Sequence, residues 1–149
     1  MLEAIYNYRQ VTTRLATSGQ PDEQALAAIA AAGYRVVINL ALHHNARSSV
    51  ADEAASVAAL GMRYVHIPVL FDAPADADLA AFFAAMDEHA GAKVWVHCAA
   101  NKRVSVFLGL YRHLRCGESV EDAFALQRDI WEPDPVWSAF QARTLAASR

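Results

Sequence analysis

Residues 93–115 constrain the fold of this chain more than any other segment. Residues 93–97 form a β-branched and aromatic run that is typical of a buried strand, and residues 103–115 have a helical pattern of apolar positions. The short loop between them holds Cys98. Unpaired N–H groups at the start of a helix favour negative charge, both on a bound anion and on a thiolate. The segment therefore predicts nucleophilic cysteine chemistry on an anionic, phosphate-like group.

Strands and helices alternate along the rest of the chain. The patterns predict further strands over residues 36–40 and 62–69, of which residues 36–40 form an interior parallel strand. They predict helices over residues 22–32, 49–60, 76–89 and 119–127 and a final helix that ends near residue 147. This order indicates an α/β domain with three layers, in which helices cover both faces of a mostly parallel central sheet. Functional loops of such sheets lie at the carboxyl ends of the strands.

Length and composition narrow the class of protein. The 149 residues predict a single domain over the whole chain. A net charge of -3 gives no electrostatic reason to expect a nucleic acid or a membrane as a partner. Two cysteines, Cys98 and Cys116, and a start that lacks the pattern of a signal peptide predict free thiols and a cytoplasmic protein. We expect Cys116, late in a helix, to be structural.

The cysteine loop resembles a known family. A strand ending in Val-His-Cys, a short loop and then Ser105 at the head of an apolar helix resemble the phosphate-binding loop of cysteine-dependent phosphatases. Within that superfamily of protein tyrosine and dual-specificity phosphatases, the chain is most similar to small bacterial enzymes, including the β-lactamase-hydrolase-like branch. Three further segments recur there in the same order: residues 17–21, 33–40 and 64–69. The resemblance implies a fold like that of dual-specificity phosphatases.

The loop departs from the family's pattern at two positions. The family has a cysteine, five variable residues, an arginine and then serine or threonine, usually with glycine third after the cysteine. Ser105 stands seven residues after Cys98, so the loop keeps its length. Asn101 replaces the glycine, and asparagine tolerates a positive φ. Val104 takes the place of the arginine and Arg103 stands one residue early, which turns its side chain by about 100° at a helix start.

The resemblance also implies roles for individual residues. Cys98 attacks phosphorus as a thiolate, Arg103 holds phosphate oxygens if the loop adjusts, Ser105 stabilises the thiolate and His97 orients the loop. Asp72, beyond the strand at residues 62–69, protonates the leaving oxygen. The backbone amides of the loop bind the phosphate, and they belong to Ala99, Ala100, Asn101, Lys102, Arg103 and Val104. No metal or cofactor is expected.

Several interpretations stay open. The preferred function is phosphomonoester hydrolysis through a phosphocysteine on Cys98. One alternative is a catalytically weak protein that binds phosphate-containing ligands or partners, and another is a thiol enzyme that transfers sulfur. His43, His44 and Arg47 follow an expected strand and are candidates for the rim of the pocket. The partner is a phosphorylated substrate or an anion, and neither the substrate nor the oligomeric state follows from the sequence.

Overall fold

The computed structural model describes residues 2–42 and 50–148, and a five-stranded sheet lies at its centre. The strand order is β1-β2-β5-β3-β4, in which only β1 is antiparallel to its neighbour. The strands are β1 (Arg9–Thr12), β2 (Leu15–Ser18), β3 (Val36–Asn39), β4 (Arg63–His66) and β5 (Val94–His97). A short 3-10 helix, η1 (Leu2–Ala4), precedes them. The α-helices are α1 (Glu23–Ala31), α2 (Glu53–Ala59), α3 (Asp76–Glu88), α4 (Lys102–Leu114), α5 (Val120–Ala123), α6 (Ala125–Ile130) and α7 (Pro135–Ala147).

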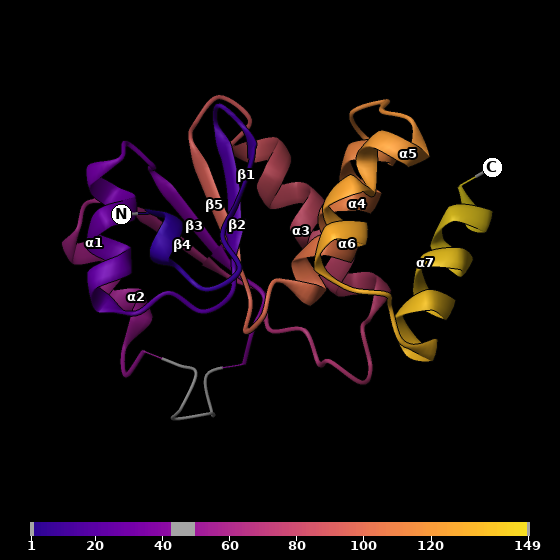
Figure 1. The fold of residues 1–149 in the computed structure, drawn as a ribbon, viewed down its shortest axis with the longest axis horizontal. Coiled ribbons are helices and arrows are strands. Elements are labelled where there is room, and N and C mark those ends of the chain that lie inside the picture. The colour runs from indigo at the N-terminus through magenta and orange to yellow at the C-terminus, as the bar shows by residue number, and fades with distance from the viewer. Residues whose placement is uncertain (1, 43–49, 149) are drawn as a thin grey trace.

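Helices cover both faces of the sheet (Figure 1). Successive residues of the interior strands point to opposite faces, so β3 sends Val37 into the core beneath α1 and α2, and Ile38 into the larger core beneath α3 to α7. In β5, Trp95 likewise points into the core beneath α1 and α2, and Val96 points into the larger core. Both faces of these strands are therefore buried, which explains why the sequence there is almost continuously apolar. The predicted fold class, a three-layer α/β domain with a mostly parallel sheet, is confirmed.

The four parallel strands end in register, and this register positions the site. Ser18 of β2 and Asn39 of β3 both pair with His97 of β5, and Asn39 also pairs with His66 of β4. Four polar residues thus form one row along the carboxyl edge of the sheet. Cys98 follows directly after this row.

Some element boundaries differ from the prediction. The strand expected over residues 62–69 ends at His66, two residues before Pro68, which has no N–H to donate to a neighbouring strand. The helix expected over residues 119–127 is two short helices that meet at Phe124, whose ring packs on Gly109 of α4. The helix expected from residue 49 begins at Glu53, with Asp52 as its N-cap. No described helix is both long and apolar enough to cross a membrane.

Candidate active site

Cys98 lies between the end of β5 and the start of α4. Its N–H donates to the carbonyl of Ser18 at 3.4 Å, so the loop continues the pairing of β5 with β2 for one residue. The helix that follows has 13 residues and begins at Lys102, where its first N–H groups have no partner within the helix. Cys98 is fully buried, so its attack on a substrate requires an opening that this conformation does not provide.

Asn101 fixes the shape of the loop. It is the N-cap of α4, its φ is 67°, and it is fully buried. Its side-chain amide donates to the carbonyl of Asn7 and to Oγ1 of Thr17, both at 2.9 Å, while Asn7 donates back to the carbonyl of Ala100 at 3.1 Å. A glycine could adopt this φ but could not make these bonds. The replacement seen in the sequence therefore anchors the loop to the chain's first residues.

Gly19 lets the segment after β2 lie close to the backbone of the cysteine loop. The Gln20 N–H donates to the carbonyl of Ala99 at 3.0 Å. A Cβ at Gly19 would lie 2.6 Å from that carbonyl oxygen and 2.6 Å from the ring of Tyr6. Only glycine fits here without a shift of backbone, so the turn at residues 18–21 forms a fixed support for the loop.

Arg103 turns away from solvent toward the segment after β4. Only 8% of the residue is exposed, and its Nη1 donates to the carbonyl of Val69 at 2.8 Å. Its guanidinium carbon lies 5.7 Å from the ring centroid of Phe71. Within residues 2–42 and 50–148, its Nε has no hydrogen-bond partner and no carboxylate pairs with the guanidinium. Val104, in contrast, is fully buried in the apolar core.

Ser105 is held by its neighbours rather than by Cys98. Its hydroxyl donates to the carbonyl of Lys102 at 2.6 Å and accepts from the indole N–H of Trp131 at 2.9 Å. The ammonium of Lys102 lies 5.3 Å from the centroid of the Trp131 ring. Stabilisation of a thiolate by Ser105 stays a prediction, because it requires the hydroxyl proton to turn away from Lys102. No pattern in the sequence indicated that Trp131 contacts this serine.

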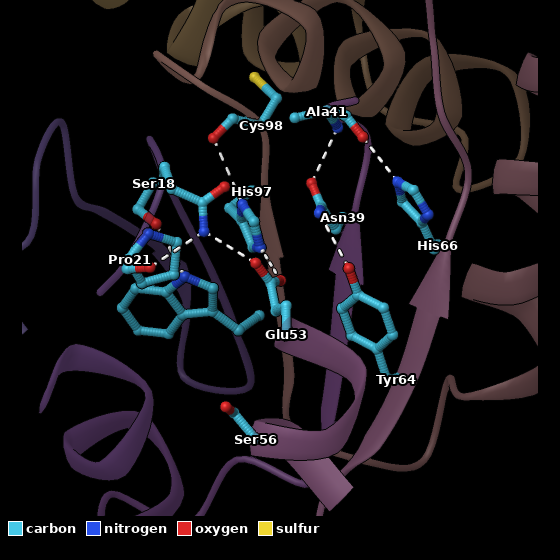
Figure 2. Close-up of polar contacts among 12 residues, drawn as sticks. Ser18, Pro21, Asn39, Ala41, Glu53, Ser56, Tyr64, His66, His97 and Cys98 are labelled. Atoms are coloured by element: carbon cyan, nitrogen blue, oxygen red, sulfur yellow. Dashed lines mark hydrogen bonds and ion pairs between the residues drawn. The ribbon is translucent and has the colours of Figure 1, made fainter. Parts of the chain in front are cut away.

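A buried polar network lies beneath the loop, and Figure 2 shows its central contacts. His97 Nε2 lies 2.6 Å from Oε2 of Glu53, and His97 Nδ1 lies 3.3 Å from the carbonyl oxygen of Cys98. Gln20 donates to the other carboxylate oxygen of Glu53 at 2.8 Å. Both His97 and Glu53 are fully buried. Sequence reasoning expected His97 to orient the loop but missed Glu53, which looks like an ordinary acidic residue in the first turn of a helix.

The network continues along the carboxyl edge of the sheet. Asn39 donates to the hydroxyl of Tyr64 at 2.9 Å and accepts from the N–H of Ala41 at 2.8 Å, and His66 donates to the carbonyl of Ala41 at 2.6 Å. Burial raises the pKa of Tyr64, and the nearby Glu53 carboxylate raises it further. Tyr64 is thus neutral at ordinary pH.

Asp72 lies in an exposed turn after β4. Two hydrogen bonds fix this turn. The indole N–H of Trp137 donates to the Phe71 carbonyl at 2.6 Å, and Nη1 of Arg103 donates to the Val69 carbonyl. The segment expected to carry the general acid is therefore attached to the loop arginine. Asp76 and Asp78 lie in the first turn of α3, where their charge suits the start of a helix. His43, His44 and Arg47 lie outside the described residues.

Comparison with known proteins identifies the family of this chain. The family described as "Beta-lactamase hydrolase-like protein, phosphatase-like domain" matches residues 7–114. A beta-lactamase hydrolase-like protein of Xylella fastidiosa is 32% identical over 102 residues, which are 67% of this chain and 23% of the relative. The chain thus spans about a quarter of the length of that relative.

Solved structures share the whole fold. A putative phosphatase (DUF442) from Shewanella putrefaciens superposes with a TM-score of 0.87 at 35% identity, covering 99% of this chain and 96% of the other. TpbA of P. aeruginosa in complex with pTyr has a TM-score of 0.67 at 18% identity, covering 95% and 90%. PTPMT1 in complex with PI(5)P has a TM-score of 0.74 at 16% identity, covering 95% and 99%. At these lower identities the likeness shows the fold alone.

Proposed function

The chain belongs to the family of phosphatase-like domains found in beta-lactamase hydrolase-like proteins, and on that premise we propose that it hydrolyses phosphomonoesters through a phosphocysteine on Cys98. The observation that carries the proposal is the buried guanidinium of Arg103, which pairs with no carboxylate of the described chain. A buried charge without a counter-ion is costly to fold around. A bound anion would supply the missing counter-ion.

The surroundings of Arg103 favour an anion with several oxygens. The guanidinium stands in the first turn of a 13-residue helix, where the partial positive charge of the helix adds to its own. Cys98 precedes this helix by four residues, so a nucleophile and a cationic N-terminus share one loop. Arg103 Nε remains available to donate to a phosphate oxygen while Nη1 holds Val69.

The reaction has two displacements. The Cys98 thiolate attacks phosphorus, the S–P bond forms, and the P–O bond of the ester breaks as the leaving oxygen takes a proton from Asp72. Water then gives a proton to the Asp72 carboxylate as its oxygen attacks phosphorus, the S–P bond breaks, and inorganic phosphate and the thiolate are released. The loop amides of residues 99–104 and Arg103 stabilise the charge on the phosphoryl oxygens in both steps.

We define the proposed substrate class by its phosphomonoester group alone and assign no leaving group. The pTyr bound to TpbA and the PI(5)P bound to PTPMT1 are different molecules that share a phosphomonoester. We therefore extend only this shared group to the present chain.

An aryl phosphate assay tests the proposal with four proteins: wild type, Cys98→Ser, Arg103→Ala and Asp72→Asn. We expect turnover in the wild type, none in Cys98→Ser, and about a hundredfold to a thousandfold slower turnover in Arg103→Ala. Acid quenching should trap a phosphoryl group on the peptide that contains Cys98. Turnover that persists in Cys98→Ser would overturn the covalent mechanism. A wild type that binds phosphate or vanadate without turnover would instead identify a phosphate-binding protein.

A further inference from the structure

Glu53 and His97 form a fully buried pair directly beneath the cysteine loop. Glu53 is the first residue of α2, and His97 is the last residue of β5, 44 positions later in the chain. Their side chains meet at 2.6 Å with no exposed surface on either one. The pair is also continuous with the loop, because His97 Nδ1 faces the carbonyl oxygen of Cys98. A buried carboxylate in this place needs a physical explanation, since it would be costly without partners.

The partners of His97 determine where its protons lie. A carboxylate oxygen of Glu53 faces Nε2, and a carbonyl oxygen faces Nδ1. Both oxygens are acceptors when Glu53 is ionised, whereas a neutral imidazole has only one N–H. Both hydrogen bonds are satisfied together when the ring carries a proton on each nitrogen. Gln20 donates to the second oxygen of Glu53, which favours the ionised carboxylate.

The groups around the pair support this distribution of charge. The titratable side chains next to the pair include Tyr64 on β4 and Cys98 on the loop, and the amide of Gln20 is neutral. Burial and the Glu53 carboxylate both raise the pKa of Tyr64, so its hydroxyl is uncharged at neutral pH. The imidazolium of His97 is then the positive group adjacent in sequence to the thiol.

We propose that Glu53 is a positioning residue of the cysteine loop: its carboxylate keeps His97 doubly protonated and directs the Nδ1–H of the ring to the Cys98 carbonyl. The inference rests on the proposed function of Cys98 as the nucleophile. The carboxylate of Glu53 contacts the side chains of His97 and Gln20. It acts through His97, whose positive charge stabilises the thiolate that attacks phosphorus.

Glu53→Gln is the informative variant because its shape is nearly unchanged. The carbonyl of the introduced amide can still accept from Gln20, and its NH2 can donate to Nε2 of His97. The ring then keeps a single proton on Nδ1 and its bond to Cys98, so the loop retains its hydrogen bonds. The variant loses both charges of the ion pair, of which the positive charge on His97 is the one adjacent to Cys98. Glu118→Gln is the matched control. It removes a carboxylate from an ion pair with Arg112 on α4, away from the cysteine loop.

Nitrogen NMR of the His97 ring is the first measurement and needs no activity. The wild type at neutral pH should give the signals of a doubly protonated ring, and Glu53→Gln those of a neutral ring protonated on Nδ1. A neutral ring in the wild type would overturn the proposal. This criterion holds even if Glu53→Gln fails to fold.

Thiolate formation is the second measurement, followed by ultraviolet absorbance against pH in a Cys116→Ser background, where Cys98 is the only thiol. Glu53→Gln should move thiolate formation and the acid limb of the pH–rate profile upward by about one pH unit, a tenfold loss of thiolate below the midpoint. Glu118→Gln should leave both unchanged. An unchanged midpoint in a folded Glu53→Gln would contradict the inference. Absence of any phosphatase activity in the wild type would refute the proposed function, while the ring and thiolate measurements still decide the role of Glu53.

Discussion

Replacement of Arg103 by methionine tests whether this arginine binds an anion or mainly supports the fold. The change removes one charged hydrogen bond to the Val69 carbonyl, a loss of about 1.5–3 kcal/mol in the free energy of unfolding. It also removes the desolvation penalty of a buried unpaired charge, which is of order several kcal/mol. The two terms oppose each other, so we expect Arg103→Met without phosphate to be about as stable as the wild type or more stable.

Phosphate should reverse this order of stability. At a concentration about 100 times its dissociation constant, phosphate stabilises the wild type by about 2.7 kcal/mol, which raises Tm by roughly 5–10 °C for a chain of this size. Loss of one charged hydrogen bond to phosphate, at the upper end of the usual range and worth nearly 3 kcal/mol, weakens binding by about a hundredfold. At the same phosphate concentration the variant would then gain only about 0.4 kcal/mol, a rise in Tm of about 1–2 °C.

Thermal unfolding with phosphate at constant ionic strength measures this difference. Chloride replaces phosphate in the reference samples, and Arg143→Met, which removes an exposed arginine of α7, serves as the matched control. The control should keep the full phosphate-dependent rise in Tm. An equal rise in Arg103→Met would refute the assignment of this guanidinium to the anion. A loss of more than about 3 kcal/mol without phosphate would show that its main role is to hold the Val69 segment.

Three further changes test the packing, the loop and the pH dependence. Gly109→Ala places a Cβ 2.4 Å from the Phe124 ring and should lower the free energy of unfolding by about 1–2 kcal/mol in urea, whereas Gly91→Ala meets open space and should change it little. Asn101→Ala loses two buried hydrogen bonds and keeps a positive φ, so a loss of about 2–4 kcal/mol is expected, and a fully stable variant would contradict the role given to its amide. Because the pKa of Tyr64 is raised in the folded protein, the unfolded chain loses that proton first, and stability should fall as pH rises above about 10. Denaturation measured at increasing pH should show a smaller fall in stability for Tyr64→Phe than for the wild type. An equal fall in both proteins would contradict this role of Tyr64.

The layers of the fold could be predicted because they depend on local patterns. Apolar runs and helical spacing identified three of the four parallel strands, β3, β4 and β5, and the helices that cover them. The hairpin of β1 and β2 could not be predicted in the same way. β1 is a four-residue strand of half-buried and exposed residues with an irregular register, so its sequence lacks an apolar run. It is stabilised by pairing with β2, and β2 by pairing with β5, about 80 residues away.

The loop could be located from sequence, but its supporting residues could not. The order of Cys98, Arg103 and Ser105 is local, and the structure keeps them in one strand–loop–helix unit. Glu53 and Trp131 reach the loop from other elements, 44 positions before His97 and 26 positions after Ser105. Neither contact leaves a sign in the spacing of nearby residues, because each depends on how helices pack on the sheet.

The one-residue displacement of the arginine is consistent with the packing of α4. Val104 is fully buried among apolar side chains of the sheet and α3 to α7, so an arginine there would place its charge in that core. Residue 103, about 100° around the helix, faces the segment after β4 and its Val69 carbonyl. Asn101 ends the loop in a left-handed conformation that is anchored to Asn7, which fixes where the helix starts and so where each later side chain points. Unlike position 104, position 103 therefore allows a guanidinium to be buried with a polar partner and still offer an N–H to an anion.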